Sequence, residues 1–363
     1  MLLDIIAGAR PNFMKIAPII KEIERRQKKE SEIKYRLIHT GQHYDRNMSG
    51  SFFEQLGIPD PDYNLEVGSG TQAEQTAVIM QRYEKILLEK PSELCLVVGD
   101  VTSTLACAIT AKKLNISVAH VEAGIRSGDR TMPEEINRLV TDSITDHFFT
   151  TSDVANENLK REGVHKEKIH YVGNTMIDTL LGNMDRLNKP KVWDDKGLSE
   201  QSYIVMTLHR PSNVDEEIQL KNLMDEILES SNKTPIVFPV HPRTRKNLEK
   251  LGIEYDSLHY TDPLSYLHFN YLVKHSMAVI TDSGGITEET TVMGIPCMTL
   301  RDSTERPETC TVGTNELLGT KPKVIKPAME KLFSGNWKKG GIPEKWDGKT
   351  AERIVKVLEK LDS

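Results

Sequence analysis

The chain has 363 residues, with 47 Lys and Arg against 53 Asp and Glu, so its formal net charge is −6. The length fits two domains with a core in each, while the acidic balance and the lack of a block of like charge argue against a nucleic-acid partner. The four cysteines show no metal-ligand spacing, no leader-like segment opens the chain, and no apolar stretch reaches about 18 residues. We therefore expect a soluble, cytoplasmic protein that contacts no membrane.

Short apolar runs rich in Val and Ile alternate with helical patterns along the chain. In the first half we expect strands at residues 2–7, 35–40, 94–98 and 117–121, and helices at 14–26 and 102–114. In the second half we expect strands at 203–208, 236–240, 278–281 and 296–300, and a closing helix at 350–361. Continuous apolar strands separated by helices predict an α/β fold whose parallel sheets are covered on both faces.

This rhythm breaks at about residues 175–200, where a short helix and a polar stretch separate the two halves. We therefore expect two Rossmann-like, doubly wound domains facing across a cleft. Residues 1–174 form the first domain and residues 175–349 the second, and we expect the closing segment 350–363 to pack back on the first.

Open parallel sheets bind ligands at the carboxyl ends of their strands. Charged, histidine and glycine residues gather where the predicted strands end, at residues 8–11, 99–100, 122–124, 209–210, 241–243 and 282–285. These strand ends therefore predict a ligand site.

The strand end at residues 282–289 reads Asp-Ser-Gly-Gly-Ile-Thr-Glu-Glu. A Gly-Gly turn that opens a helix directs backbone N–H groups and the helix dipole at one point, which suits a phosphate. Ser283, Gly284 and Gly285 are thus candidate phosphate ligands, and Glu289, one turn later, is placed to reach a ribose hydroxyl. Taken alone, the motif is equally compatible with an ordinary strand-to-helix turn.

Residues 8–15 read Gly-Ala-Arg-Pro-Asn-Phe-Met-Lys. They occupy the position of a dinucleotide-binding fingerprint without matching it, which argues against NAD, and they are not a P-loop. Arg10 and Lys15 could hold a diphosphate, although Lys15 could also be a solvated helix residue. Residues 300–308 add two further arginines, Arg301 and Arg306, after another predicted strand.

Three carboxylates follow strands or begin a helix in the first half. Asp100 and Glu122 each end a strand, and Glu134 follows Pro133 at a helix start. Acids in a first turn are ordinary helix chemistry, whereas Glu122 follows an apolar strand and needs a partner there, which Arg126 or Arg138 could supply. Several carboxylates at adjacent strand ends suit the removal and return of a proton.

Two histidines, His209 and His241, also follow predicted strands, where they could serve a site or simply cap the strand. Zinc-site spacing, a Ser-His-Asp elbow and a Schiff-base arrangement are all missing from the sequence.

Together these motifs resemble the bacterial and archaeal non-hydrolysing UDP-N-acetylglucosamine 2-epimerases over nearly the whole chain. The motifs that carry the resemblance lie in both halves, at residues 8–15, 40–43, 99–100, 120–127, 132–138, 173–175, 208–210, 240–242, 282–289 and 301–308. The resemblance implies the two-domain glycosyltransferase-B architecture, a homodimer, and no redox cofactor or metal ligand.

The implied reaction removes the C2 proton of UDP-N-acetylglucosamine and expels UDP to give a 2-acetamidoglucal. UDP then adds back to the other face, with reprotonation, to give UDP-N-acetylmannosamine for surface polysaccharide. The resemblance makes acid/base candidates of Asp100, Glu122, Glu134 and His209. It assigns substrate binding to Arg10, Lys15, His241, Phe269, Ser283, Gly284, Gly285, Glu289 and Arg306, with Phe269 near the uracil. Domain closure would exclude water from the glucal.

Two positions depart from the family pattern. Leu264 stands where several relatives carry a glutamine near the uracil, and Asp45 stands where relatives activated by a second substrate molecule carry glutamine. Activation by substrate is thus left open. Residues 42–59 also resemble the branch that acts on UDP-diacetamido-uronic acids, although the Arg306-Pro307 pair favours N-acetylglucosamine.

Three alternatives remain on the same fold. A hydrolysing epimerase would release free N-acetylmannosamine, a UDP-sugar glycosyltransferase would need an acceptor and leave the C2 hydrogen in place, and a nucleotide-sugar sensor would have no use for the acids.

Overall fold

The structure is a computed structural model that describes residues 1–29, 31–41, 55–240, 242–253 and 255–362. At five positions it describes the backbone alone: Arg10, Pro211, Ser212, Pro242 and Arg243. The described chain divides into two compact units, unit 1 with residues 1–182 and 344–363 and unit 2 with residues 183–343.

Unit 1 is built on a parallel sheet with the strand order β3-β2-β1-β4-β5-β6-β7. Its strands are β1 (Leu2–Ala7), β2 (Lys34–His39), β3 (Tyr63–Asn64), β4 (Leu94–Val98), β5 (Ser117–Val121), β6 (His147–Thr150) and β7 (Ile169–Tyr171). Every residue of the central strand β4 is buried, as expected for a parallel strand covered on both faces. The order reverses beside β1, which places a topological switch point between β1 and β4.

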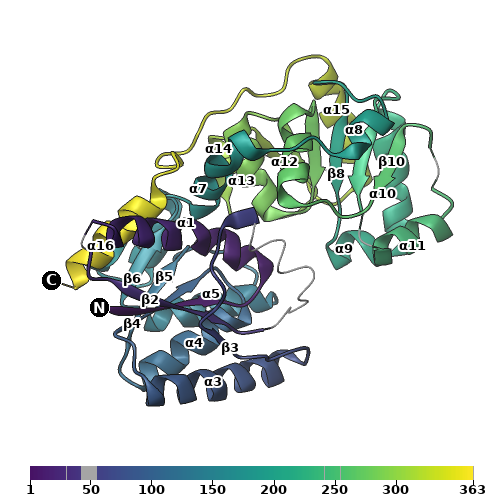
Figure 1. The fold of residues 1–363 in the computed structure, drawn as a ribbon. Helices are drawn as coiled ribbons and strands as arrows, with labels where there is room; N and C mark the ends of the chain where they lie inside the picture. Colours follow the sequence, from purple (N-terminus) through teal and green to yellow (C-terminus); the bar gives the residue numbers. More distant parts are fainter. Residues whose placement is uncertain (30, 42–54, 241, 254, 363) are drawn as a thin grey trace. The chain divides into compact units, whose positions relative to one another are not determined.

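Helices cover both faces of this sheet (Figure 1). They are α1 (Arg10–Gln27), α3 (Gln72–Glu89), α4 (Thr102–Lys113), α5 (Pro133–Ile144), α6 (Asp153–Arg161), α7 (Thr175–Asn183) and α16 (Thr350–Leu361), with a 3-10 turn at Lys166–Lys168. Figure 1 shows α1 and α16 on one face and α3 and α4 on the other. Helix α3 begins with a capping box, in which Thr71 and Glu74 satisfy each other's backbone N–H groups.

The last segment of the chain belongs to unit 1. The side chain of Trp346 is 1% exposed and its indole N–H donates to the carbonyl oxygen of Thr151 at 3.2 Å. The carboxylate of Asp178 on α7 accepts from the backbone N–H groups of Thr350 and Ala351, at 3.1 and 2.7 Å, and so caps α16. The boundaries between the two compact units lie at 182/183 and 343/344, whereas the sequence predicted 174/175 and 349/350.

Unit 2 contains a second parallel sheet, with the order β10-β9-β8-β11-β12-β13. Its strands are β8 (Ile204–Thr207), β9 (Ile236–Pro239), β10 (Leu258–Thr261), β11 (Ala278–Thr281), β12 (Cys297–Thr299) and β13 (Asn315–Leu317). Its helices are α8 (Lys191–Asp195), α9 (Pro211–Val214), α10 (Glu217–Ser230), α11 (Pro242–Lys250), α12 (Tyr266–His275), α13 (Gly284–Met293), α14 (Pro307–Thr311) and α15 (Ile325–Phe333), with 3-10 turns at Met184–Arg186 and Pro322–Val324.

The sheet of unit 2 has a hydrophobic core on each of its two faces. Ile204, Met206 and Phe238 pack beneath α10 and α15 on one face, and Val205 and Val237 pack beneath α12 on the other. Alternate residues of one strand therefore enter different cores, which is the pattern of a doubly wound sheet. The predicted α/β class with two parallel sheets is confirmed.

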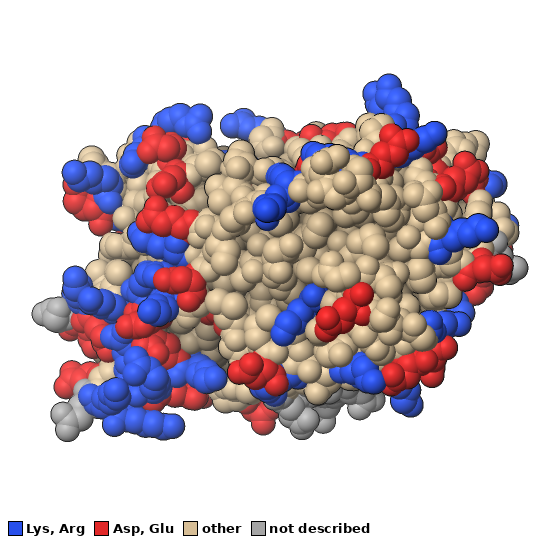
Figure 2. Space-filling model, turned by 90° about the horizontal axis from the view of Figure 1, so that it is seen from above, with Lys and Arg blue, Asp and Glu red and all other residues tan. Residues whose placement is uncertain are grey.

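Within the described ranges, the helices lack either the length or the apolar character required to cross a bilayer. Figure 2 shows Lys and Arg side chains interspersed with Asp and Glu side chains on one face of the molecule. On that face the charges of the two signs are therefore mixed and form no field of a single sign.

Candidate active site

The candidate residues of unit 1 begin at the turn between β1 and α1. Asn12 is 1% exposed, and its Oδ1 accepts from the backbone N–H groups of Gly8 and Ala9 at 3.1 and 3.0 Å. Its Nδ2 donates to the carbonyl oxygen of Val98 at 3.2 Å. The amide thus ties the end of β1 to the end of β4, at the switch point. Arg10 is the first residue of α1.

Lys15 lies one turn further along α1, and its Nζ is 2.8 Å from Oε2 of Glu122. The two side chains are only 12% and 3% exposed. A buried carboxylate requires such a partner because desolvation penalises its charge. The sequence suggested Arg126 or Arg138 as a partner of Glu122, and the structure shows an ion pair with Lys15. Arg126 contacts Asp142 and Glu162.

Glu122 has an unusual backbone conformation, with a φ of +72°. Its N–H donates to the carbonyl oxygen of Phe149 at 3.0 Å, which anchors the turn after β5 to β6. A left-handed conformation costs a non-glycine residue roughly 1–3 kcal/mol and is concentrated at functional sites. The strained backbone of this turn therefore directs the Glu122 carboxylate toward Lys15.

Asp100 follows Gly99, whose φ is +66°. A Cβ at Gly99 would stand 2.7 Å from Nζ of Lys15 and 3.8 Å from Oε2 of Glu122. The missing side chain at Gly99 thus provides the space that the Lys15–Glu122 pair occupies. The structure brings Lys15, Glu122 and the Gly99–Asp100 turn together at adjacent strand ends.

Helix α5 holds Asp100 from its other side. The guanidinium of Arg138 pairs with the Asp100 carboxylate, and Nδ2 of Asn137 donates to the Asp100 carbonyl oxygen at 2.8 Å. Arg138 also lies 2.8 Å from Glu135, which accepts from the N–H of Ser127 at 2.9 Å. Burial acts to raise the pKa of Glu135, but these hydrogen bonds outweigh it and hold the pKa below its usual value. The buried acid of this helix start is Glu135, while the predicted Glu134 is exposed.

Unit 2 has its own group of candidate residues, where β8 and β11 end side by side. The carboxylate of Asp282 accepts from the N–H of His209 at 3.0 Å and from the N–H of Arg210 at 2.9 Å, and lies 2.7 Å from Nδ1 of His209. Burial acts to raise the pKa of Asp282, but its bonds to His209 and its neighbours hold the pKa low. The His209 side chain is 62% exposed, so an oriented imidazole faces outward.

Ser283, Gly284 and Gly285 form the start of α13, and all three are partly accessible. A Cβ at Gly284 would lie 3.5 Å from Nη1 of Arg301, so this guanidinium stands beside the helix start. Arg301 is also 2.6 Å from Glu305. The amide groups and a nearby cation provide positive potential for a phosphate.

Arg306 is buried and forms an ion pair with Glu288 of α13. Glu289, the next residue, is 4% exposed and lies 3.4 Å from Nδ2 of Asn270 on α12. Burial raises the pKa of Glu289 to about 7, although bonds from Tyr266 and Asn270 act in the opposite direction. Phe269, between these two residues of α12, is half-buried against the core.

Two predicted residues are not placed by these contacts. His241 lies outside the described residues, as do residues 42–54, on which the question of activation by substrate and much of the uronic-acid resemblance depend. For Arg10 the description ends at its backbone.

Sequence reasoning missed several polar residues that support the site. Asn12, Asp142, Tyr266 and Asn270 are all buried, although Asn and Asp usually lie at the surface. Their positions within apolar helical patterns gave no sign of their partners. Asp282 was visible in the motif, but its role as the anchor of His209 was not.

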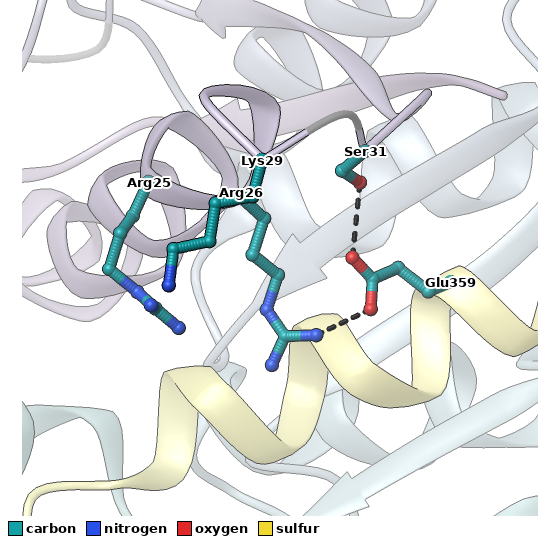
Figure 3. A pocket seen from close by; sticks show the side chains of 5 residues that line it. All are labelled: Arg25, Arg26, Lys29, Ser31 and Glu359. Carbon is teal, nitrogen blue, oxygen red and sulfur yellow. Dashed lines mark hydrogen bonds and ion pairs between the residues drawn. The ribbon is translucent and has the colours of Figure 1, made fainter.

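A separate cavity of about 390 Å³ lies at the opposite end of α1 (Figure 3). Arg26 pairs there with Glu359 of α16, and the Ser31 hydroxyl donates to the same carboxylate at 3.1 Å. Arg25 and Lys29 complete the lining. Basic residues in the last turn of a helix favour its dipole, and the cavity follows the seam between α1 and α16, away from the carboxyl ends of the strands.

Comparison with known proteins identifies the family of the chain. The model of the family described as UDP-N-acetylglucosamine 2-epimerase matches residues 25–359. The chain is 43% identical to a UDP-N-acetylglucosamine 2-epimerase of Methanocaldococcus jannaschii, over 99% of both chains. It is 40% identical to a UDP-2,3-diacetamido-2,3-dideoxy-D-glucuronate 2-epimerase of Pseudomonas aeruginosa, over 98% of this chain and 99% of the other.

Solved structures show the same similarity. The crystal structure of the Methanocaldococcus jannaschii UDP-GlcNAc 2-epimerase in complex with UDP-GlcNAc and UDP has a TM-score of 0.88 and 41% identity, covering 99% of this chain and 100% of that one. The Neisseria meningitidis enzyme bound to UDP-GlcNAc has a TM-score of 0.89 and 30% identity, with 99% and 100% covered. The predicted glycosyltransferase-B-type fold is confirmed. The chain belongs to the UDP-N-acetylglucosamine 2-epimerase family.

Proposed function

We propose that this protein interconverts UDP-N-acetylglucosamine and UDP-N-acetylmannosamine by inverting C2 of the sugar. The observation that carries the proposal is the buried Lys15–Glu122 ion pair beside the Gly99–Asp100 turn, in a chain of this family. A fixed ammonium keeps a buried carboxylate ionised, and an ionised carboxylate can remove a proton.

The reaction has two halves that mirror each other. In the first, a carboxylate takes the C2 proton while the C1–O bond breaks, the electron pair of that bond leaves with UDP, and a C1–C2 double bond forms. In the second, a phosphate oxygen of UDP attacks C1 and a second acid delivers a proton to the opposite face of C2. The two faces require two acid/base groups, for which we propose Glu122 and Asp100, with Glu134 and His209 as further candidates.

The leaving UDP needs cations and backbone donors that stabilise its diphosphate. We propose that Ser283, Gly284, Gly285 and Arg306 hold it in unit 2, and that Glu289 accepts from the ribose near Phe269. We propose that Arg10, Lys15 and His241 also bind the UDP-sugar. The amides at the start of α13 and the buried carboxylate one turn later support this assignment.

The test is incubation of the pure protein with UDP-N-acetylglucosamine in D₂O, followed by proton NMR. The expected result is deuterium at C2 together with a new UDP-linked manno signal. Product without exchange at C2 would contradict the elimination route, and release of free N-acetylmannosamine would indicate a hydrolysing epimerase.

A second candidate substrate is a UDP-2,3-diacetamido-uronic acid. The relative from Pseudomonas aeruginosa, 40% identical over 98% of this chain, favours it. The same NMR experiment with this sugar decides between the two, because the preferred substrate has the higher kcat/KM.

We further propose that the enzyme works as a homodimer in the cytoplasm and feeds surface polysaccharide synthesis. Its four cysteines are free thiols, three of them buried, which suits a reducing compartment. Light scattering would test the dimer, since a monomer at working concentration would contradict it.

A further inference from the structure

Two buried residues beneath the candidate carboxylates have no role in the proposed chemistry. His120 is the fourth residue of β5 and is 0% exposed, and Asp142 lies near the end of α5 with 4% exposure. The Nδ1 atom of His120 lies 2.7 Å from Oδ1 of Asp142. The Nε2 atom of the same ring lies 2.8 Å from the carbonyl oxygen of Gly99.

The partners of this ring fix its orientation. A backbone carbonyl oxygen can only accept a hydrogen bond, and so can an ionised carboxylate. Burial acts to raise the pKa of Asp142, but the charges and hydrogen bonds of His120 and Arg126 hold it below the usual value. The His120 ring is therefore held between the Asp142 carboxylate and the Gly99 carbonyl oxygen.

Asp142 also binds the turn that contains Glu122. Its Oδ2 atom accepts from the N–H of Gly124 at 2.9 Å and lies 2.7 Å from Arg126. Gly124 has a φ of +78°, and a Cβ there would stand 2.4 Å from the carbonyl oxygen of Ala155. The turn after β5 is thus held in one conformation by the carboxylate on one side and close packing on the other.

The two contacts of His120 connect the turns that carry the two candidate acids. Gly99 immediately precedes Asp100, and Gly124 is two residues after Glu122. The strands before these turns pair directly, since Val98 is opposite Val121. Helix α5 therefore holds both turns: Asn137 and Arg138 bind Asp100 near its start, and Asp142 binds the Glu122 turn near its end.

We propose that His120 and Asp142 are a positioning pair that fixes Asp100 and Glu122 relative to each other for the two proton transfers at C2. Neither residue touches substrate in this assignment. The inference rests on the proposed function, because it presumes that the two carboxylates act on opposite faces of one carbon.

If the pair positions the two carboxylates, its loss should lower kcat and leave KM nearly unchanged. Displacing one carboxylate relative to the other impairs proton transfer, and a misplacement of about 1 Å can cost about 100-fold in rate. Outer contacts of this kind typically contribute 10–100-fold. Five residues that are proposed to hold UDP lie in unit 2, namely Ser283, Gly284, Gly285, Glu289 and Arg306. Neither His120 nor Asp142 is assigned a contact with Arg10 or Lys15, so the KM for the UDP-sugar should change little.

The test compares Asp142→Asn with Asp146→Asn. Asp146 is a matched control, since its carboxylate accepts from the N–H of Val118 at 2.9 Å and pairs with Lys112, at the other end of β5. We expect Asp142→Asn to lower kcat about 10–100-fold with a KM within about threefold of wild type. Asp146→Asn should retain the wild-type kcat even where it lowers the melting temperature.

A spectroscopic measurement accompanies the kinetics. In protein labelled with ¹⁵N-histidine, the His120 N–H that is hydrogen-bonded to Asp142 should give a far-downfield proton signal. This signal should vanish in Asp142→Asn and persist in Asp146→Asn. If Asp142→Asn does not fold, His120→Gln takes its place with kcat and KM as the readouts, because its amide can satisfy only one of the two acceptors.

An unchanged kcat in the Asp142 or His120 variant overturns the proposal. So does an equal loss of kcat in Asp146→Asn, which would trace the effect to stability alone. If the wild-type enzyme epimerises neither UDP-sugar, the proposed function fails instead. An active wild type with an active Asp142→Asn variant refutes only the positioning pair.

Discussion

The Nζ atom of Lys15 lies 2.8 Å from Oε2 of Glu122, and water reaches little of either side chain. Breaking a buried ion pair by removing one partner typically costs about 3–5 kcal/mol, because the remaining charge is left buried and uncompensated. The two residues therefore connect the stability of unit 1 with the charge state of the candidate base.

Lys15→Met should lower the free energy of unfolding by about 3–5 kcal/mol and abolish most turnover. The double variant Lys15→Met, Glu122→Gln should recover part of this stability, since no buried charge remains, but none of the activity. Urea titrations of the four proteins in the cycle measure the effect. Additive losses of stability in the double variant would show that the two side chains act independently.

Asp100→Asn should reduce kcat by about 10²–10⁴, as expected when an acid/base group is removed. The change keeps the shape of the side chain, so affinity for UDP should remain close to that of wild type. Steady-state kinetics and calorimetric titration with UDP measure both quantities. Near-normal turnover would exclude Asp100 from proton transfer.

Gly99→Ala tests the space that the missing side chain provides. The new Cβ would stand 2.7 Å from Nζ of Lys15 in a left-handed backbone conformation. We therefore expect the free energy of unfolding to fall by roughly 1–3 kcal/mol. We also expect kcat to fall about tenfold or more, because the displaced Lys15 moves the candidate catalytic carboxylate.

Gly163→Ala is the control for that substitution. Gly163 has a φ of +89° with nothing within 4 Å of a Cβ, so its replacement should cost only the backbone strain, about 1–2 kcal/mol. Equal kcat values for the two alanine variants would contradict the steric explanation.

Glu289 should make stability depend on pH. Burial raises its folded pKa to about 7 from a reference value of 4.5, so the folded protein binds the proton more tightly than the unfolded chain does. Stability from this group is complete below about pH 4.5 and is lost as the pH rises through 7, with a total on the order of 3 kcal/mol. Glu289→Gln should flatten that part of the curve in urea titrations between pH 5 and 8. If the free energy of unfolding depended on pH in the same way in the wild type and in Glu289→Gln, Glu289 would not be the group responsible.

The central part of each sheet could be predicted from the sequence, and the edges could not. The expected strands at 2–7, 94–98, 117–121 and 278–281 match β1, β4, β5 and β11 residue for residue, because strands buried on both faces are continuous apolar runs. Strands β3, β6, β7, β10 and β13 were missed. They are two to four residues long, and all except β6 are only partly buried, so they carry little of that pattern.

The site divides in the same way. Glycine-rich turns and charged strand ends mark Asp100, Glu122 and Ser283 in the sequence, because their positions follow directly from the strands. The partner of Glu122 is 107 residues away along the chain, and the residues that hold Asp100 lie on a helix whose buried side is polar. Such pairings depend on how helices pack across a sheet, which local patterns do not encode.

The return of the chain into unit 1 has a consequence for how the protein is made. Unit 2 is one uninterrupted stretch of sequence, so all of its residues are synthesised before Trp346 and α16. Unit 1 contains the earliest strands, yet it obtains Trp346 and α16 only after the whole of unit 2 has been made. On the ribosome the surface beneath α16 therefore stays uncovered until then, and a truncation before Trp346 would keep unit 1 in that unfinished state.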